Sequence, residues 1–218
     1  MNAIKICGLD TPQAAEAAAR AGATHGGFVF FEKSPRFLAP ERARALALAT
    51  PPALQRVALL VDADDEAISA AIAAIKPHML QLHGAEPPER VAALRARFGI
   101  AVMKVMGVSD AAGITAFIRA YENVSDWLMF DAKAPAGAAR PGGLGAPFDW
   151  RLLSGLRLAK PWFLAGGLTP ENVGTAIAQS GARSVDVSTG VEDAPGRKSV
   201  EKITEFLARA KKAFEETA

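Results

Sequence analysis

The sequence predicts a single-domain α/β protein, a (β/α)8 barrel with a parallel eight-stranded core that spans residues 1–218. Short apolar runs with strand character alternate with longer helical segments from one end of the chain to the other. Parallel strands need helical crossovers, so this strict alternation favours parallel over antiparallel pairing. Eight such units in 218 residues give about 27 residues per unit, near the lower end of the usual size range for this barrel.

Eight segments have the composition of buried strands. In chain order they are residues 3–7, 27–31, 56–61, 79–83, 101–105, 127–131, 162–165 and 184–188. The intervening segments space their apolar residues as helices do. They are residues 11–20, 40–49, 65–75, 88–98, 111–121, 170–179 and 200–214. Leu152, Leu153 and Leu156 indicate a shorter helix before the seventh strand, which completes eight helices.

The alternative fold is a doubly wound open sheet. Such a sheet would carry a GxGxxG segment after its first strand, and the sequence has none there. No linker or low-complexity tract divides the chain. The most irregular segment, residues 134–147, is rich in Gly, Ala and Pro and predicts a loop after the sixth strand.

Composition excludes several classes of protein. Half of the residues are hydrophobic and 22% are charged, which suits a large core and excludes bulk disorder. A net charge of +2 without a Lys/Arg block predicts no nucleic-acid and no membrane partner. One cysteine cannot form an internal disulfide, and with three histidines it argues against structural zinc. Without a signal peptide or a membrane-length apolar run, we expect a cytoplasmic protein.

Polar residues end four of the predicted strands, where barrels of this kind carry their chemistry. They are Cys7, His83, Asp131 and Ser188. Side chains alternate along a strand, so apolar neighbours that face the helices leave these polar groups facing the interior. The same alternation places Lys5, Gln81 and Asp186 inside. Each residue alone has an ordinary structural interpretation, such as a small buried thiol or a turn. Their convergence at one end of one barrel predicts an active site.

Two glycine-containing segments predict a phosphate site. Residues 165–170 (AGGLTP) end the seventh strand and open a helix, and residues 188–192 (STGVE) follow the eighth strand. Glycines let backbone N–H groups approach an anion closely, and helix N-termini add a favourable dipole. Barrels frequently bind phosphate between these two loops. We therefore expect a small phosphorylated substrate here.

Six segments, in order, resemble the phosphoribosylanthranilate isomerase family of tryptophan biosynthesis. They are KICG at 5–8, SPR at 34–36, QLHG at 81–84, FDW at 148–150, LAGGL at 164–168 and VDVSTGVE at 185–192. The resemblance implies an Amadori rearrangement of N-(5-phosphoribosyl)anthranilate to 1-(2-carboxyphenylamino)-1-deoxyribulose 5-phosphate, the third step from chorismate. The substrate nitrogen acts as the electron sink, so we expect no cofactor and no metal.

The resemblance also implies roles for individual residues. Cys7 matches the general base of the family and Asp131 its general acid, whereas Asp126 begins the same strand at the opposite end of the barrel. Arg36 would meet the anthranilate carboxylate. The remaining substrate contacts are expected from Gln81, His83, Gly166, Gly167, Asp186, Ser188, Thr189 and Gly190. We expect a monomer or a homodimer.

Two departures and one hypothesis concern the chemistry. Leu144 lies in a Gly-Gly-x-Gly loop where the family commonly has a hydroxyl residue, which removes a side-chain contact from that loop. Thr189 stands where a second Ser is usual and keeps a hydroxyl. Lys5 lies two residues from Cys7 on the same face, and we expect it to lower the pKa of the thiol.

Three other functions are weighed against this one. A sugar-phosphate isomerase of histidine biosynthesis performs the same rearrangement with two aspartates, but here the first strand ends in Cys7. A pentulose-phosphate epimerase would need a metal, for which His83 and Asp131 are only two candidate ligands. A non-catalytic barrel that binds a phosphosugar has no need of both Cys7 and Asp131.

Overall fold

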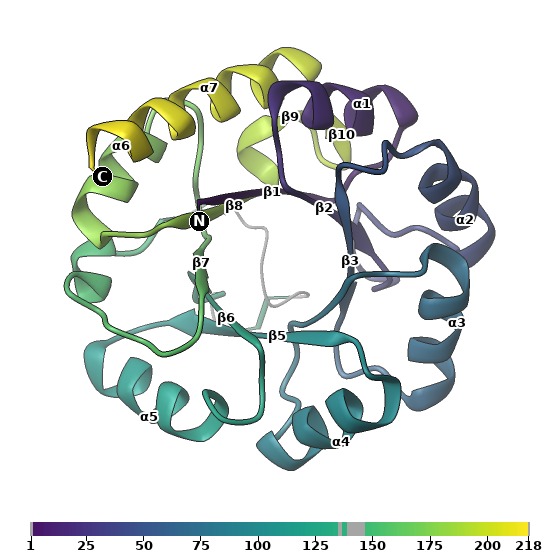
Figure 1. Ribbon diagram of the computed structural model, residues 1–218, viewed down its shortest axis with the longest axis horizontal. Helices are drawn as coiled ribbons and strands as arrows, with labels where there is room; N and C mark the ends of the chain where they lie inside the picture. Colours follow the sequence, from purple (N-terminus) through teal and green to yellow (C-terminus); the bar gives the residue numbers. More distant parts are fainter. Residues whose placement is uncertain (1, 135–136, 139–146, 218) are drawn as a thin grey trace.

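Eight parallel strands close into a barrel in sequence order, with helices around the outside (Figure 1). The computed structural model describes residues 2–134, 137–138 and 147–217. The strands are β1 Ala3–Cys7, β2 His25–Val29, β3 Gln55–Leu60, β4 Met79–Leu82, β5 Ala101–Val108, β6 Trp127–Ala132, β7 Trp162–Leu164 and β8 Ser184–Val187. The predicted fold class is confirmed, and every predicted strand is present with shifted bounds at most.

In the described part of the chain, an α-helix follows each strand of the barrel except the sixth, and these helices begin where local chemistry favours them. They are α1 Pro12–Ala21, α2 Pro40–Ala49, α3 Asp65–Ile75, α4 Pro88–Phe98, α5 Ala111–Tyr121, α6 Val173–Ser180 and α7 Val200–Glu216. Thr11, Asp64 and Asp110 each accept a hydrogen bond from a backbone N–H in the first turn of α1, α3 and α5. Figure 1 shows α7 beside α1, so the last helix packs against the first.

The shorter helix predicted between the sixth and seventh strands is present only as a 3-10 helix, which contains Leu152 and Leu153 but ends before Leu156. It is η1, Trp150–Leu153, which Asp149 caps through the backbone N–H of Arg151. The chain then becomes extended at Ser154 and takes a left-handed conformation at Gly155 (φ +73°), so the turn cannot continue. Most of the predicted 134–147 loop lies outside the described residues.

A short hairpin after the eighth strand was not predicted. The 3-10 turn η2 (Thr189–Val191) leads into β9 (Glu192–Ala194), which pairs with β10 (Arg197–Lys198) in antiparallel fashion. Strands of two and three residues are too short to show an alternating pattern in sequence. This hairpin brings two charged side chains to the barrel mouth.

Two apolar layers lie on either side of the barrel wall. Outward residues such as Ile6, Leu80 and Phe130 are buried against the helices. Inward residues form a separate cluster, which includes Met79, Met103, Met129, Phe163 and Ala165. The alternation used to orient the strands therefore holds around the barrel, and the interior is a packed core rather than a pore.

Lys5 and Asp186 form an ion pair inside this core. They are register partners on β1 and β8, the strands that close the barrel, and Lys5 Nζ lies 2.7 Å from Asp186 Oδ1. Lys5 is fully buried. Although burial lowers the pKa of Lys5, the carboxylate of Asp186 raises it above its ordinary value, so the lysine keeps its charge.

His25 packs among aromatic rings at the N-terminal ends of the strands. Its ring centroid lies 6.0 Å from that of Trp127 and 5.5 Å from that of Phe163. Its Nδ1 is 2.7 Å from Thr24 Oγ1. Burial, with the nearby charges of Lys5 and His78, lowers the pKa of His25 to about 4. The histidine is therefore neutral in the folded protein at neutral pH.

The lowered pKa of His25 predicts a loss of stability in mild acid. Between about pH 6.5 and pH 4 the unfolded chain binds a proton at His25 that the folded chain does not, so the unfolding free energy decreases as the pH falls through this window. The loss is about 3 kcal/mol over the whole window. Urea unfolding at pH 7, 6 and 5 measures it. His25→Gln should flatten most of the pH dependence, whereas His78→Gln, at an exposed position, should retain most of it; equal slopes in both variants would contradict the assignment.

Candidate active site

Cys7 lies at the C-terminal end of β1, directly above Lys5 in the barrel interior. The backbone of Gly27 on β2 makes room for both side chains, because a Cβ there would lie 3.1 Å from Cys7 Sγ and 3.2 Å from Lys5 Nζ. Cys7 is 4% exposed. Its carbonyl accepts a hydrogen bond from Ser188 Oγ at 3.1 Å, which ties β1 to the loop after β8.

Burial and the neighbouring lysines act in opposite directions on the pKa of Cys7. Burial raises the pKa of the thiol, and Asp186 adds to this effect. Lys5 and Lys198 lower the pKa, but less than burial raises it, so the net shift is upward. The predicted contribution of Lys5 therefore has the expected direction, but burial outweighs it and leaves the pKa of the thiol above its ordinary value.

Asp131 lies across the mouth at the end of β6 and pairs with His83 from the end of β4. His83 Nε2 is 3.3 Å from Asp131 Oδ2, and both side chains are about nine-tenths buried. The backbone N–H of Ala132 donates to Asp131 Oδ1 at 2.7 Å. Gly166 (φ +87°) packs against the same carboxylate, since a Cβ there would overlap Ala132 N and lie 2.9 Å from Asp131 Oδ1. The first glycine loop therefore helps to hold Asp131 in place.

Gln81 lies behind His83 rather than in the open mouth. The side chain is fully buried. Its Nε2 is 3.5 Å from His83 Nδ1 and 3.6 Å from the sulfur of Met129. In this structure Gln81 contacts His83, and its expected contact with the substrate stays a prediction.

Arg36 is held by an acidic residue that the sequence analysis did not single out. Its Nε and Nη2 donate to the two carboxylate oxygens of Glu192 at 2.6 and 2.8 Å, and Nη2 also donates to Thr189 Oγ1 at 3.0 Å. Lys198 joins the same carboxylate, with its Nζ 2.7 Å from Glu192 Oε1 and 2.9 Å from the carbonyl of Ser188. The only sequence signal was Glu192 at the end of the VDVSTGVE segment; nothing distinguished Lys198.

The pairing affects the ionisation of Glu192. Burial raises the pKa of this carboxyl group, but the hydrogen bond from Arg36 and the charge of Lys198 outweigh burial and bring the pKa below its ordinary value. Glu192 is therefore an anion at neutral pH. It holds two cations beside Thr189 and Ser188, two of the residues expected to bind phosphate.

The two glycine loops meet, as the sequence analysis expected. A Cβ on Gly190 would overlap the carbonyl oxygen of Leu168, so only glycine permits this approach. Asn172 braces the first loop, because its Oδ1 accepts from Thr169 N and its Nδ2 donates to the carbonyl of Gly167, both at 2.8 Å. The Gly-Gly-x-Gly loop with Leu144 lies outside the described residues.

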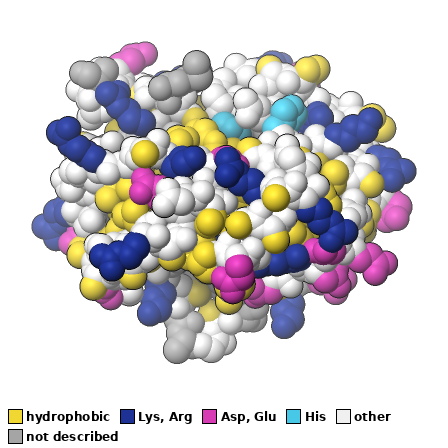
Figure 2. All heavy atoms as spheres, turned by 60° about the horizontal axis from the view of Figure 1, so that its bottom comes forward, with side chains coloured by type: hydrophobic (Ala, Val, Ile, Leu, Met, Phe, Trp, Pro, Cys, Tyr) yellow, Lys and Arg dark blue, Asp and Glu magenta, His cyan; other side chains and the backbone are white. Residues whose placement is uncertain are grey.

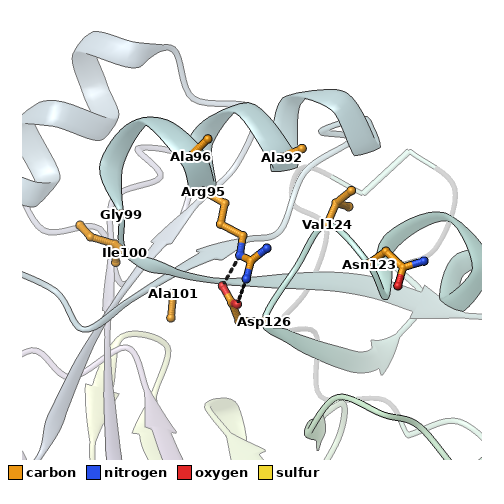
Figure 3. A pocket seen from close by; sticks show the side chains of 9 residues that line it. All are labelled: Ala92, Arg95, Ala96, Gly99, Ile100, Ala101, Asn123, Val124 and Asp126. Carbon is orange, nitrogen blue, oxygen red and sulfur yellow. Dashed lines mark hydrogen bonds and ion pairs between the residues drawn. The ribbon is translucent and has the colours of Figure 1, made fainter.

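Asp126 lies at the opposite end of the barrel from Asp131. Figure 3 shows its carboxylate facing the guanidinium of Arg95 from α4, across a pocket at the start of β5 and β6. Arg95 Nη2 is 2.7 Å from Asp126 Oδ1. Asp126 is thus part of a peripheral ion pair, away from the mouth.

The outer surface carries charges of both signs. On the face that Figure 2 shows, basic and acidic side chains are interspersed with apolar ones. Among residues 2–134, 137–138 and 147–217, no helix is long and apolar enough to cross a membrane. Within the same residues, no three His, Cys, Asp or Glu side chains gather as a metal site would require.

Comparison with known proteins identifies the family. The family model for N-(5'-phosphoribosyl)anthranilate (PRA) isomerase matches residues 4–209. The chain belongs to this isomerase family. It is 51% identical over 208 residues to the N-(5'-phosphoribosyl)anthranilate isomerase of Cereibacter sphaeroides, covering 95% of this chain and 98% of the relative. The enzyme of the same name from Paracoccus denitrificans is 50% identical over 207 residues, covering 95% and 96%.

Solved structures of related enzymes agree with this family assignment. Phosphoribosyl anthranilate isomerase from Thermotoga maritima has 35% identity and a TM-score of 0.85, covering 97% of this chain and 100% of that one. A phosphoribosyl anthranilate isomerase in complex with reduced 1-(o-carboxyphenylamino)-1-deoxyribulose 5-phosphate has 33% identity and a TM-score of 0.81, with the same coverage. The chain is therefore an isomerase of tryptophan biosynthesis with the barrel fold of its family.

The arrangement around Glu192 predicts a stability effect. Glu192→Gln would leave Arg36 and Lys198 buried next to each other without their shared anion, and we expect the unfolding free energy to fall by about 3 kcal/mol. Glu205→Gln on α7 is the control, because it breaks an exposed pair with Arg209 and should cost less than about 1 kcal/mol. Urea unfolding of the two variants measures the difference. Equal, small losses would show that Glu192 is not required to hold the two cations.

Proposed function

We propose that this isomerase converts N-(5-phosphoribosyl)anthranilate to 1-(2-carboxyphenylamino)-1-deoxyribulose 5-phosphate with Cys7 as general base and Asp131 as general acid. The observation that carries the proposal is their placement at the ends of β1 and β6, in the same mouth as two glycine loops. The carboxyl ends of barrel strands are where such enzymes carry out their chemistry. The reduced ligand bound by the related solved enzyme supports a phosphorylated substrate of this class.

The reaction needs one proton donor and one proton acceptor. Asp131 protonates the furanose ring oxygen, the C1′–O bond breaks, and the nitrogen lone pair forms a Schiff base at C1′. Cys7 as thiolate then removes the proton from C2′, and the electrons move toward the nitrogen to give an enolamine. Ketonisation places a proton on C1′. Positioned proton transfer of this kind contributes about 10²–10⁴-fold to a rate.

The raised pKa of Cys7 has two opposite effects on catalysis. It reduces the fraction of thiolate at neutral pH and makes each thiolate a stronger base. Lys5 and Lys198 limit the upward shift. We propose that the two lysines keep a usable thiolate fraction in a mouth that burial would otherwise leave as thiol.

His83 is the group that we propose resupplies the proton to Asp131. Its Nε2 faces Asp131 Oδ2, and its other nitrogen faces Gln81. Gln81 then acts by orienting the imidazole. Asp186 contributes through Lys5, with which it shares an ion pair below Cys7.

Arg36 and the glycine loops are proposed to bind the two ends of the substrate. Arg36 already donates hydrogen bonds from Nε and Nη2 to Glu192. Its Nη1 would therefore be the nitrogen that donates to the anthranilate carboxylate. The backbone of Gly166, Gly167 and Gly190 with the hydroxyls of Ser188 and Thr189 would hold the phosphate. Lys198 and Arg36 lie against this second loop and supply positive charge.

For the assembly we propose a monomer or a homodimer; a dimeric enzyme from Thermotoga maritima and monomers generated from it are among the related structures.

Substitution of each proposed group tests the assignment. Cys7→Ser and Asp131→Asn keep shape but remove the base and the transferable proton, so kcat should fall by about two to four orders of magnitude while KM changes little. The decrease in anthranilate fluorescence on adding freshly prepared substrate measures turnover. Asp126→Asn at the other end of β6 is the control and should keep normal kcat. Near-normal turnover by Cys7→Ser would transfer the role of base to another residue of the mouth, with His83 the first to examine.

A further inference from the structure

Another buried ion pair lies just outside the barrel wall, and no step of the proposed mechanism uses it. Lys104 is on β5 and Glu86 is in the loop between β4 and α4; Lys104 Nζ is 2.7 Å from Glu86 Oε2. Both side chains are at least 96% buried. The loop that carries Glu86 begins with His83, the residue that faces Asp131.

Both charges of this pair act on the peptide groups around Gly84. Each carboxylate oxygen of Glu86 accepts from the backbone N–H of Gly84 at 3.1 Å. Lys104 Nζ donates to the carbonyl oxygen of Gly84 at 2.6 Å. The peptide groups on both sides of Gly84 are thus fixed by charge-assisted hydrogen bonds, which are stronger than neutral ones. Gly84 directly follows His83, so these hydrogen bonds also restrict the backbone conformation of His83.

The same loop is held by the neighbouring strand and helix. The backbone N–H of Asp62, after β3, donates to Glu86 Oε1 at 2.9 Å, and Asp62 Oδ1 accepts from Ala85 N at 2.6 Å. Asp62 has φ +48°, a left-handed conformation that costs a non-glycine residue energy. From α5, the hydroxyl of Tyr121 donates to the carbonyl of Glu86 at 3.0 Å. The His83 loop is therefore held from β3, β5 and α5 together.

Stability alone is a poor explanation for such a pair. Burying two charges costs desolvation, and apolar residues of similar volume often give equal or greater stability. Hydrogen bonds to defined acceptors and donors do specify one loop geometry, however. Displacement of a catalytic group by about 1 Å can cost about 100-fold in rate.

We propose that Glu86 and Lys104 are positioning residues of the isomerase, which hold the β4–α4 loop so that His83 Nε2 stays within hydrogen-bonding reach of Asp131. The proposal rests on the proposed role of Asp131 as general acid. In this role Glu86 and Lys104 act through their hydrogen bonds to Gly84, the residue that follows His83. Loss of the hydrogen bonds from Glu86 and Lys104 should impair proton transfer from His83 to Asp131 and leave the phosphate loops and Arg36 unchanged.

The test compares Glu86→Gln with the double variant Glu86→Gln/Lys104→Met. The double variant is included because the single substitution leaves a buried lysine without its anion. We expect kcat to fall about 10- to 100-fold in both, with KM within about twofold of the wild type. Nitrogen chemical shifts of the His83 imidazole, followed by NMR against pH, should change in both variants, since the ring loses its fixed contact with Asp131. A purely structural role would not move this signal.

Arg95→Met is the matched control. It removes the ion pair between α4 and Asp126, which lies directly before β6 at the N-terminal end of the barrel (Figure 3), whereas His83 follows the C-terminal end of β4. We expect it to lower Tm without changing kcat or the His83 signals. Asp131→Asn is measured in the same series.

Each outcome decides between the assignments. Wild-type kcat and His83 signals in the double variant, with Asp131→Asn inactive, would overturn the positioning role and leave the acid assignment intact. A normal kcat for Asp131→Asn would overturn the acid assignment, on which the positioning role depends. A fall in kcat with a matching fall in Arg95→Met would show a general stability effect and would also overturn the proposal.

Discussion

The buried ion pair between Lys5 and Asp186 is the interaction on which the site depends most. It joins the first and last strands of the barrel, and it fixes where positive charge lies beneath the mouth. An uncompensated ammonium in this core would cost several kcal/mol, so Asp186 is required for Lys5 to be charged there. Because Asp186 already neutralises Lys5, the thiol of Cys7 above it gains only part of the effect of the lysine. The strength and scarcity of the proposed base therefore follow first from burial of the thiol, which the charge of Lys5 offsets only in part.

The other charged residues of the mouth are also paired, and each pair joins parts of the fold that are distant in sequence. Arg36 after β2 meets Glu192 and Lys198 of the β9–β10 hairpin. His83 after β4 meets Asp131 after β6. Close backbone approaches at Gly166 and Gly190 complete the connections between neighbouring loops. The mouth is therefore held largely by polar contacts between loops, above a barrel held by apolar packing, and this division suits a site that must keep several ionisable groups in a fixed geometry.

Sequence patterns predicted the features that depend on local chemistry. Strand alternation placed Lys5, Cys7 and Asp131 in the interior, and the glycine segments predicted which loops would meet. The patterns failed where the outcome depends on which of several partners a residue finds in space. The sequence predicts that Arg36 binds a carboxylate of the substrate, but only the fold shows that the carboxylate of Glu192 also pairs with it. Nothing in the local sequence distinguishes Lys198 or Lys104 from a surface lysine. The short helix before β7 was predicted, but its 3-10 type and its end at Leu153 were not, because leucine spacing over four residues is the same in an α-helix and in a single turn.

The most direct test of this account is a pH titration of the Cys7 thiol in the free enzyme. The chain has one cysteine, so the ultraviolet absorbance of the thiolate reports Cys7 alone. Because the thiol is buried and Lys5 is paired with Asp186, the account predicts a titration midpoint for Cys7 above that of the reference free cysteine, an amino acid with both termini blocked, in the same buffer. A midpoint below that of the free cysteine would contradict the account, because it would mean that the charge of Lys5 outweighs the effect of burial on the thiol.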